Sequence, residues 1–94
     1  MSARKKPTPE EYKARVNQAI QLMETIVNDR LTPRNIRKVV SEGIELLKSE
    51  KLSLAARAVQ VIESLDEIMQ DPNMPLYART KLWQIISYLE GIRD

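Results

Sequence analysis

The sequence predicts an all-α protein, a four-helix up-and-down bundle built from two helical hairpins. Apolar residues recur every three or four positions in four separate segments, which is the spacing of an amphipathic helix. Prolines and polar stretches of about three to five residues separate the segments, and connections this short make neighbouring helices antiparallel. No segment alternates between apolar and polar residues as a half-buried strand does. Two open hairpins of the HEAT type are the alternative, because they would have the same helices and stripes.

The first helix is predicted from about Pro9 to Asn28. Thr8-Pro9-Glu10-Glu11 is a capping box, in which the Thr8 hydroxyl accepts from the Glu11 amide. Proline at the first helical position fits this start, because its missing N–H would have no partner there. The apolar stripe that follows consists of Tyr12, Val16, Ala19, Ile20, Met23, Ile26 and Val27.

The second and third helices each have a start signal and an apolar stripe. Thr32-Pro33 repeats the threonine–proline start, and the second helix is predicted to end near Ser49. Ser53 is the predicted N-cap of the third helix, and the stretch 71–75, with two prolines, ends it. The two stripes are Ile36, Val39, Val40, Gly43, Ile44 and Leu47, then Leu54, Ala58, Val61, Ile62, Leu65, Ile68 and Met69.

The fourth helix is predicted to open at Pro75 and to be capped by Gly91. Its core stripe consists of Ala78, Leu82, Ile85, Ile86 and Leu89. Leu76 and Trp83 lie at the flank of that stripe. Trp83 is predicted to pack at the edge of the core, and a dimer interface along this flank is the alternative. The opposite face carries Tyr77 and Tyr88, with Lys81 between them. We therefore expect a partner surface formed by Tyr77, Lys81, Trp83 and Tyr88.

A weak internal repeat relates the two hairpins. Shifting the chain by 42 residues places Asp29 on Asp71 and Arg37 on Arg79, together with several apolar positions and a proline. We interpret the repeat as a duplicated hairpin, with coincidence as the alternative, because any two amphipathic hairpins share apolar positions. Because an arginine near a helix N-terminus opposes the macrodipole, each arginine is predicted to pair with the aspartate of its own turn.

Composition excludes most enzyme classes. The chain has 94 residues and contains neither cysteine nor histidine, so thiolate nucleophiles, imidazole bases and the usual zinc sites are absent. Its two glycines exclude a glycine-rich phosphate loop. The clustered acids Glu63, Asp66 and Glu67 fall off the apolar stripe and are expected to face water. We therefore expect a non-enzymatic protein with no catalytic residues, cofactor or metal, located in the cytoplasm and not in a membrane.

The sequence predicts a basic disordered tail, residues 1–8, followed by one domain, residues 9–94. Charge is distributed unevenly along the chain. Residues 1–38 carry nine Lys or Arg and four Asp or Glu, whereas residues 39–94 carry six and nine. The candidate contacts to RNA or phosphate are the tail cations and four cations around the first predicted turn, with a solvated basic turn as the alternative. These residues are Arg4, Lys5, Lys6, Arg30, Arg34, Arg37 and Lys38.

Three segments resemble a known family. The stretch Asp71-Pro72-Asn73-Met74-Pro75, with the Ala78-Arg79-Thr80 and Leu82-Trp83 that follow, is similar to the most recognisable part of uncharacterised protein family 0147, a group of short archaeal proteins. Thr32-Pro33-Arg34-Asn35-Ile36-Arg37 and Ser64-Leu65-Asp66-Glu67-Ile68 resemble its other recurrent stretches, and the similarity runs from about Val16 to Leu89. The resemblance implies a bundle of four up-and-down helices and an archaeal cytoplasm. It implies no activity, substrate or functional residue.

Two functions remain open at this point. The first is an interaction module that docks onto an RNA–protein assembly such as the archaeal ribosome through the basic turn and tail. The second is a homodimeric scaffold without a nucleic-acid role, in which the fourth helix forms the interface. A third reading, a small-molecule pocket inside the bundle, depends only on small residues such as Gly43 and Ala58, which more often mark close helix packing.

Overall fold

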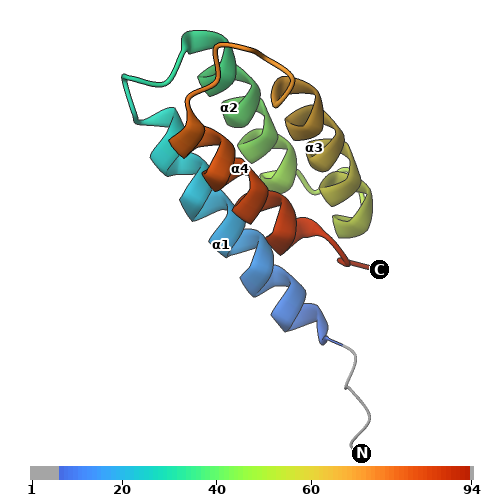
Figure 1. Cartoon of the computed structure of the whole chain (residues 1–94). Coiled ribbons are helices and arrows are strands. Elements are labelled where there is room, and N and C mark those ends of the chain that lie inside the picture. Colours follow the sequence, from blue (N-terminus) through green and yellow to red (C-terminus); the bar gives the residue numbers. More distant parts are fainter. Residues whose placement is uncertain (1–6, 94) are drawn as a thin grey trace, which may run out of the picture.

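The computed structural model describes residues 7–93, which form four α-helices and no strand. The helices are α1 (Pro9–Val27), α2 (Arg34–Lys48), α3 (Leu54–Ile68) and α4 (Leu76–Leu89). They run up and down beside one another, with the α1–α2 and α3–α4 turns at one end of the molecule and the α2–α3 turn at the other (Figure 1).

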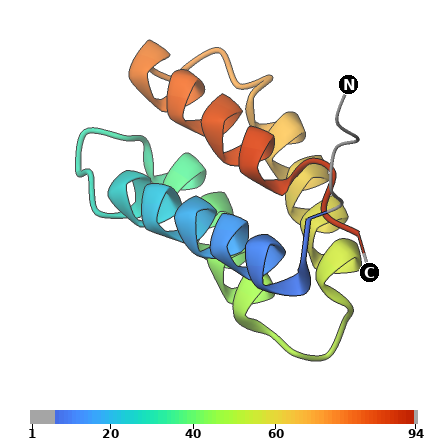
Figure 2. The same cartoon turned by 90° about the horizontal axis from the view of Figure 1, so that it is seen from below.

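The helices close into a bundle. Helix α1 packs against both α2 and α4, and α2 packs against α3. The α3–α4 pairing completes the ring and is the least extensive of the four. Figure 2 shows the first and last helices side by side, which two open HEAT-type hairpins would not allow. The predicted bundle is therefore confirmed.

One apolar core fills the space between the helices. The predicted stripes supply it, and Met23, Ile36, Leu65 and Ile85 are among its fully buried side chains. Gly43 packs against Met23 and Val61: a Cβ there would lie 2.8 Å from Met23 Cε, the flexible end of that side chain, and 3.5 Å from Val61 Cγ1. The small residues thus mark close packing, as expected.

The starts of the helices follow two patterns. Thr8 and Ser53 cap α1 and α3 with their hydroxyls, as predicted. Helices α2 and α4 are preceded by Pro33 and Pro75 and have no side-chain cap, so the prediction that Pro75 is the first helical residue is wrong by one position. Thr32 does not cap α2, because its side chain is buried and bonds elsewhere.

The last helix ends where glycine permits a change of direction. Gly91 has φ +79°, a left-handed conformation that residues with a Cβ rarely adopt. The Ile92 N–H then bonds the Leu89 carbonyl, and the Ile92 side chain joins the core. Among the described residues no helix is both long and apolar enough to cross a membrane.

Candidate nucleic-acid interface

The α1–α2 and α3–α4 turns are built by the same hydrogen bonds. In the first, Asp29 Oδ1 accepts from the Leu31 N–H at 3.0 Å, and the Asp29 carbonyl accepts from the Thr32 N–H at 3.1 Å. In the second, Asp71 Oδ1 accepts from the Asn73 N–H at 2.8 Å, and the Asp71 carbonyl accepts from Met74 at 3.2 Å. The 42-residue repeat therefore corresponds to a repeated turn.

The arginines after the turns do not pair with these aspartates. Arg79 Nη1 donates to the Met69 carbonyl at 2.7 Å, and Asp71 Oδ2 accepts from Asn35 Nδ2 at 2.6 Å. The predicted Asp71–Arg79 pair is therefore wrong. Instead, Arg79 donates to a backbone carbonyl at the end of α3. This hydrogen bond offsets the unfavourable interaction of its positive charge with the N-terminal end of α4.

A third arginine, which the repeat did not reveal, makes the same bond. Arg57 Nη1 donates to the Leu47 carbonyl at 2.7 Å, again ten residues back and at the end of the preceding helix. Arg37, Arg57 and Arg79 are each the fourth residue of their helix. The series becomes visible when the helix starts of the structure are aligned, rather than the hairpins.

Arg37 is the exception in this series. Its side chain is half-buried, and its Nε is buried without a hydrogen-bond partner within the described residues. The predicted Asp29–Arg37 pair is not formed either, since the bonded partners of the Asp29 carboxylate are the Leu31 amide and neighbouring side chains. The guanidinium of Arg37 is thus held at the start of α2 without the carbonyl that Arg57 and Arg79 have.

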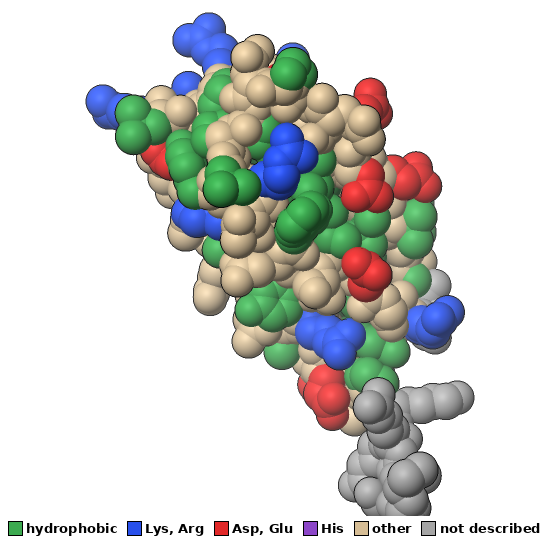
Figure 3. Space-filling view, in the orientation of Figure 1, with side chains coloured by type: hydrophobic (Ala, Val, Ile, Leu, Met, Phe, Trp, Pro, Cys, Tyr) green, Lys and Arg blue, Asp and Glu red, His purple; other side chains and the backbone are tan. Residues whose placement is uncertain are grey.

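The other cations of this turn are exposed. Arg30 lies in the α1–α2 turn, and Arg34 and Lys38 lie one helical turn apart at the start of α2. Within residues 7–93 none of the three has a hydrogen bond or ion pair through its side chain. Figure 3 shows the resulting polarity: Lys and Arg side chains gather at the end with the α1–α2 turn, and Asp and Glu side chains gather beside α3. We call Arg30, Arg34, Arg37 and Lys38 the basic end.

A polar network fixes the turn against α4. The Tyr77 hydroxyl lies 3.2 Å from Thr32 Oγ1, and Lys81 Nζ donates to Thr25 Oγ1 at 3.1 Å. The Leu31 N–H holds the pKa of Asp29 below its ordinary value, and the hydroxyls of Tyr77 and Thr32 act in the same direction. Asp29 is therefore an anion that belongs to the turn and leaves the basic end uncompensated.

The second turn is joined to the start of α2. The Asp71 carboxylate accepts hydrogen bonds from the Asn73 N–H of its own turn and from the Asn35 side chain. The bond from the Asn73 N–H is the main reason that the pKa of Asp71 lies below its ordinary value. The 2.6 Å Asn35–Asp71 bond links the first turn of α2 to the α3–α4 turn. The backbone that carries Arg34 and Lys38 is thereby held in place.

The predicted partner surface divides into two parts. Tyr77 and Lys81 bond α1 and its turn, and Tyr88 lies over the α1–α4 seam, half-exposed. Trp83 is 62% exposed, and Leu76 is 77% exposed. The prediction that Trp83 packs at the edge of the core is wrong, because Ala78, Leu82 and Ile85 occupy the inner face of α4. The candidate contacts Arg4, Lys5 and Lys6 lie outside the described residues.

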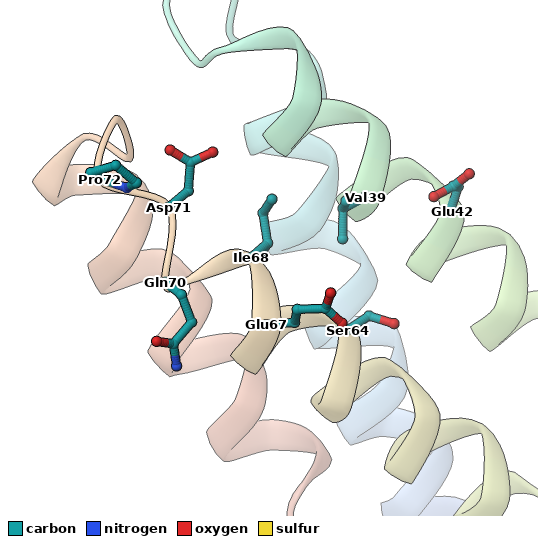
Figure 4. A pocket seen from close by; sticks show the side chains of 8 residues that line it. All are labelled: Val39, Glu42, Ser64, Glu67, Ile68, Gln70, Asp71 and Pro72. Atoms are coloured by element: carbon teal, nitrogen blue, oxygen red, sulfur yellow. The ribbon is translucent and has the colours of Figure 1, made fainter.

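An acidic groove lies between α2 and α3 near the second turn (Figure 4). Glu42, Glu67 and Asp71 carry its charge, and they are spread along the groove rather than gathered at one point. Among residues 7–93 no three acidic side chains are placed to hold a metal ion. The predicted acids Glu63, Asp66 and Glu67 are exposed, as expected.

Comparison with known proteins shows the family. The model of the uncharacterised protein family UPF0147 matches residues 3–92. A UPF0147 protein of Aeropyrum pernix is 43% identical over 92% of this chain and 94% of its own length, and one of Metallosphaera sedula is 48% identical over 86% and 91%.

Two solved structures have the same fold. A crystal structure of the protein of unknown function MMP1188 has a TM-score of 0.85 and 36% identity, covering 97% of this chain and all of that one. A UPF0147 protein of Thermoplasma acidophilum has a TM-score of 0.83 and 34% identity, covering 89% and 99%. The fold, the family model and the archaeal relatives agree, and the chain belongs to the uncharacterised protein family UPF0147.

Proposed function

We propose that this protein is a non-enzymatic helical module that docks onto an RNA–protein assembly through its basic end. The observation that carries the proposal is the group of cations around the start of α2, which no carboxylate of the described residues neutralises. The ribosome is the assembly that we would test first.

The fold gains nothing from these charges. Helix α2 has no acidic residue in its first turn and no side-chain cap, so its positive dipole end adds to the field of Arg34, Arg37 and Lys38. Each cation at such a position costs about 0.3–1 kcal/mol of stability. An anionic partner would turn that cost into binding energy, and a phosphate backbone is a partner of suitable charge.

The arrangement also suits phosphate chemically. Arg34 and Lys38 are four residues apart on the exposed side of α2, and Arg30 extends the charge into the turn. The guanidinium of Arg37 lies beside them, and because its Nε is buried, only its terminal nitrogens can reach a phosphate. An arginine fork and a flexible lysine together bind phosphate oxygens without reading sequence.

Fluorescence anisotropy with a structured RNA tests the proposal. If three or four phosphates are contacted, affinity falls roughly 40- to 150-fold between 50 and 200 mM salt. The double variant Arg34→Glu and Lys38→Glu should lose most of the binding and lower the salt slope by about 2. It should fold normally, because an acid in the first turn of α2 suits the dipole.

The matched control reverses two exposed cations at the other end. Lys13 lies near the start of α1, and Lys51 lies in the α2–α3 turn. The variant Lys13→Glu and Lys51→Glu changes the net charge by the same amount. Equal losses in both variants, or no loss in the first, would contradict the proposal.

A further inference from the structure

We propose that the exposed face of α4 pairs with the α4 of a second copy of this chain, with the two helices parallel. This inference uses a different surface from the basic end, and its test involves no RNA. Either proposal therefore stands or fails alone.

The face has the pattern of a helix–helix seam. Leu76, Thr80, Trp83 and Ser87 follow one another at spacings of four, three and four residues and are all exposed. Large apolar residues thus alternate with small ones, which lets a second helix approach closely. The Thr80 hydroxyl already donates to the Leu76 carbonyl at 3.1 Å, so Thr80 needs no polar partner across the seam.

Apolar surface continues from this seam toward α3. Val59 on α3 is 53% exposed, and Figure 3 shows hydrophobic side chains exposed along α4 and beside α3. The α3–α4 pairing is also the least extensive in the bundle. Several exposed large apolar side chains on one side of a protein are typical of an interaction site.

The charges beside the seam indicate the occupant. On the α3 side lie the exposed acids Glu63 and Asp66, together with the half-buried Arg79, and on the α1 side lie the half-buried Lys81 and Arg15. Lys81 donates to Thr25 Oγ1 and also attracts the Asp29 carboxylate, and Arg15 donates to the Glu90 carbonyl oxygen. A surface that is acidic on one side and basic on the other is complementary to itself.

The direction of the pairing follows from these flanks. A two-fold axis parallel to α4 places the α3 side of one copy over the α1 side of the other, whereas a perpendicular axis places acid on acid. Glu63 and Lys81 also lie at similar distances from the α3–α4 turn, measured along their helices. Glu63 is five residues before the end of α3 and Lys81 is five residues after the start of α4, each about 7.5 Å from the turn. A parallel pair therefore brings Glu63 opposite Lys81 of the second copy.

Single cysteines test this geometry directly, because the chain has none of its own. In a parallel pair every residue of the seam lies close to its own copy, so Thr80→Cys and Ser87→Cys should each form a disulfide-linked dimer under mild oxidation. Glu45→Cys, on the exposed side of α2, is the control for random collision. Sedimentation equilibrium of the unmodified chain should show the dimer mass, and Trp83, the only tryptophan, should shift its emission to shorter wavelength on association.

A charge exchange provides the second arm. Glu63→Lys and Lys81→Glu should each weaken association about fivefold, and the combined variant should recover most of the loss. A monomer at all concentrations, or cross-linking no faster than in Glu45→Cys, would overturn the proposal. So would a disulfide that forms only when Thr80→Cys and Ser87→Cys are mixed, since that result indicates antiparallel helices.

Discussion

The α1–α2 turn and the α3–α4 turn share a backbone, yet their matching positions have different neighbours. Asp29 and Asp71 bond their turns in the same way. Arg79 donates to the carbonyl of Met69, whereas the Nε of Arg37 is buried without a partner among the described residues. A duplicated structural element thus has one copy whose arginine bonds the end of the preceding helix and another whose arginine makes no such bond.

The same contrast appears at the buried position of each turn. Met74 fills it in the second turn, and Thr32, which bonds Tyr77, fills it in the first. The second turn is held by apolar packing and an arginine, and the first by a polar network that also involves α4. We therefore expect the second turn to contribute more to stability and the first more to binding.

The largest expected effect is at the two buried positions. Met74→Ala should lower the free energy of unfolding by about 2–5 kcal/mol, because it removes packed atoms from the core. Thr32→Val keeps the volume and loses the hydroxyl that contacts Tyr77 and Asp29, at about 0.5–1.5 kcal/mol per hydrogen bond, so it should cost less than Met74→Ala. Urea unfolding of both variants measures the difference. Equal costs would show that the two turns are held by the same kind of contact.

The two arginines give the next effect. Arg79→Met should cost about 1–3 kcal/mol, because the Met69 carbonyl loses its side-chain donor. Arg37→Met removes a guanidinium whose Nε has no partner, so thermal unfolding should change little while RNA affinity falls. A large loss of stability in Arg37→Met would place that arginine in the fold instead.

The smallest effect is a dependence on pH shared by both turns. The pKa values of Asp29 and Asp71 are lowered in the folded state, chiefly by the N–H of Leu31 and of Asn73. The stability that they contribute is fully present above the aspartate pKa of the unfolded chain, about 4. It is lost as the pH falls through the lower pKa values that these groups have in the folded protein. Asp29→Asn with Asp71→Asn keeps the turn acceptors and removes the titration. Acid unfolding of this variant should therefore have a shallower pH dependence than that of the unchanged chain, and an unchanged dependence would assign it to other carboxylates.

Local spacing in the sequence predicted the core but not the outer contacts. Leu65 and Ile85 are buried as predicted, because helical periodicity depends on neighbours along the chain. Trp83 was misplaced because its burial depends on how far α3 covers α4, which is a property of packing between helices. The Arg57 and Arg79 bonds to carbonyls ten residues back depend on how each loop closes. The cations of the basic end were predicted from charge alone, and only the structure separated Arg37 from Arg79.

Sedimentation of a native cell lysate through a sucrose gradient, at low and at high salt, tests the central claim most directly. If the basic end contacts RNA, the protein should migrate with ribosomal particles at low salt and return to the top of the gradient at high salt, because phosphate contacts weaken steeply with ionic strength. A position at the top of the gradient in both salts would contradict the account.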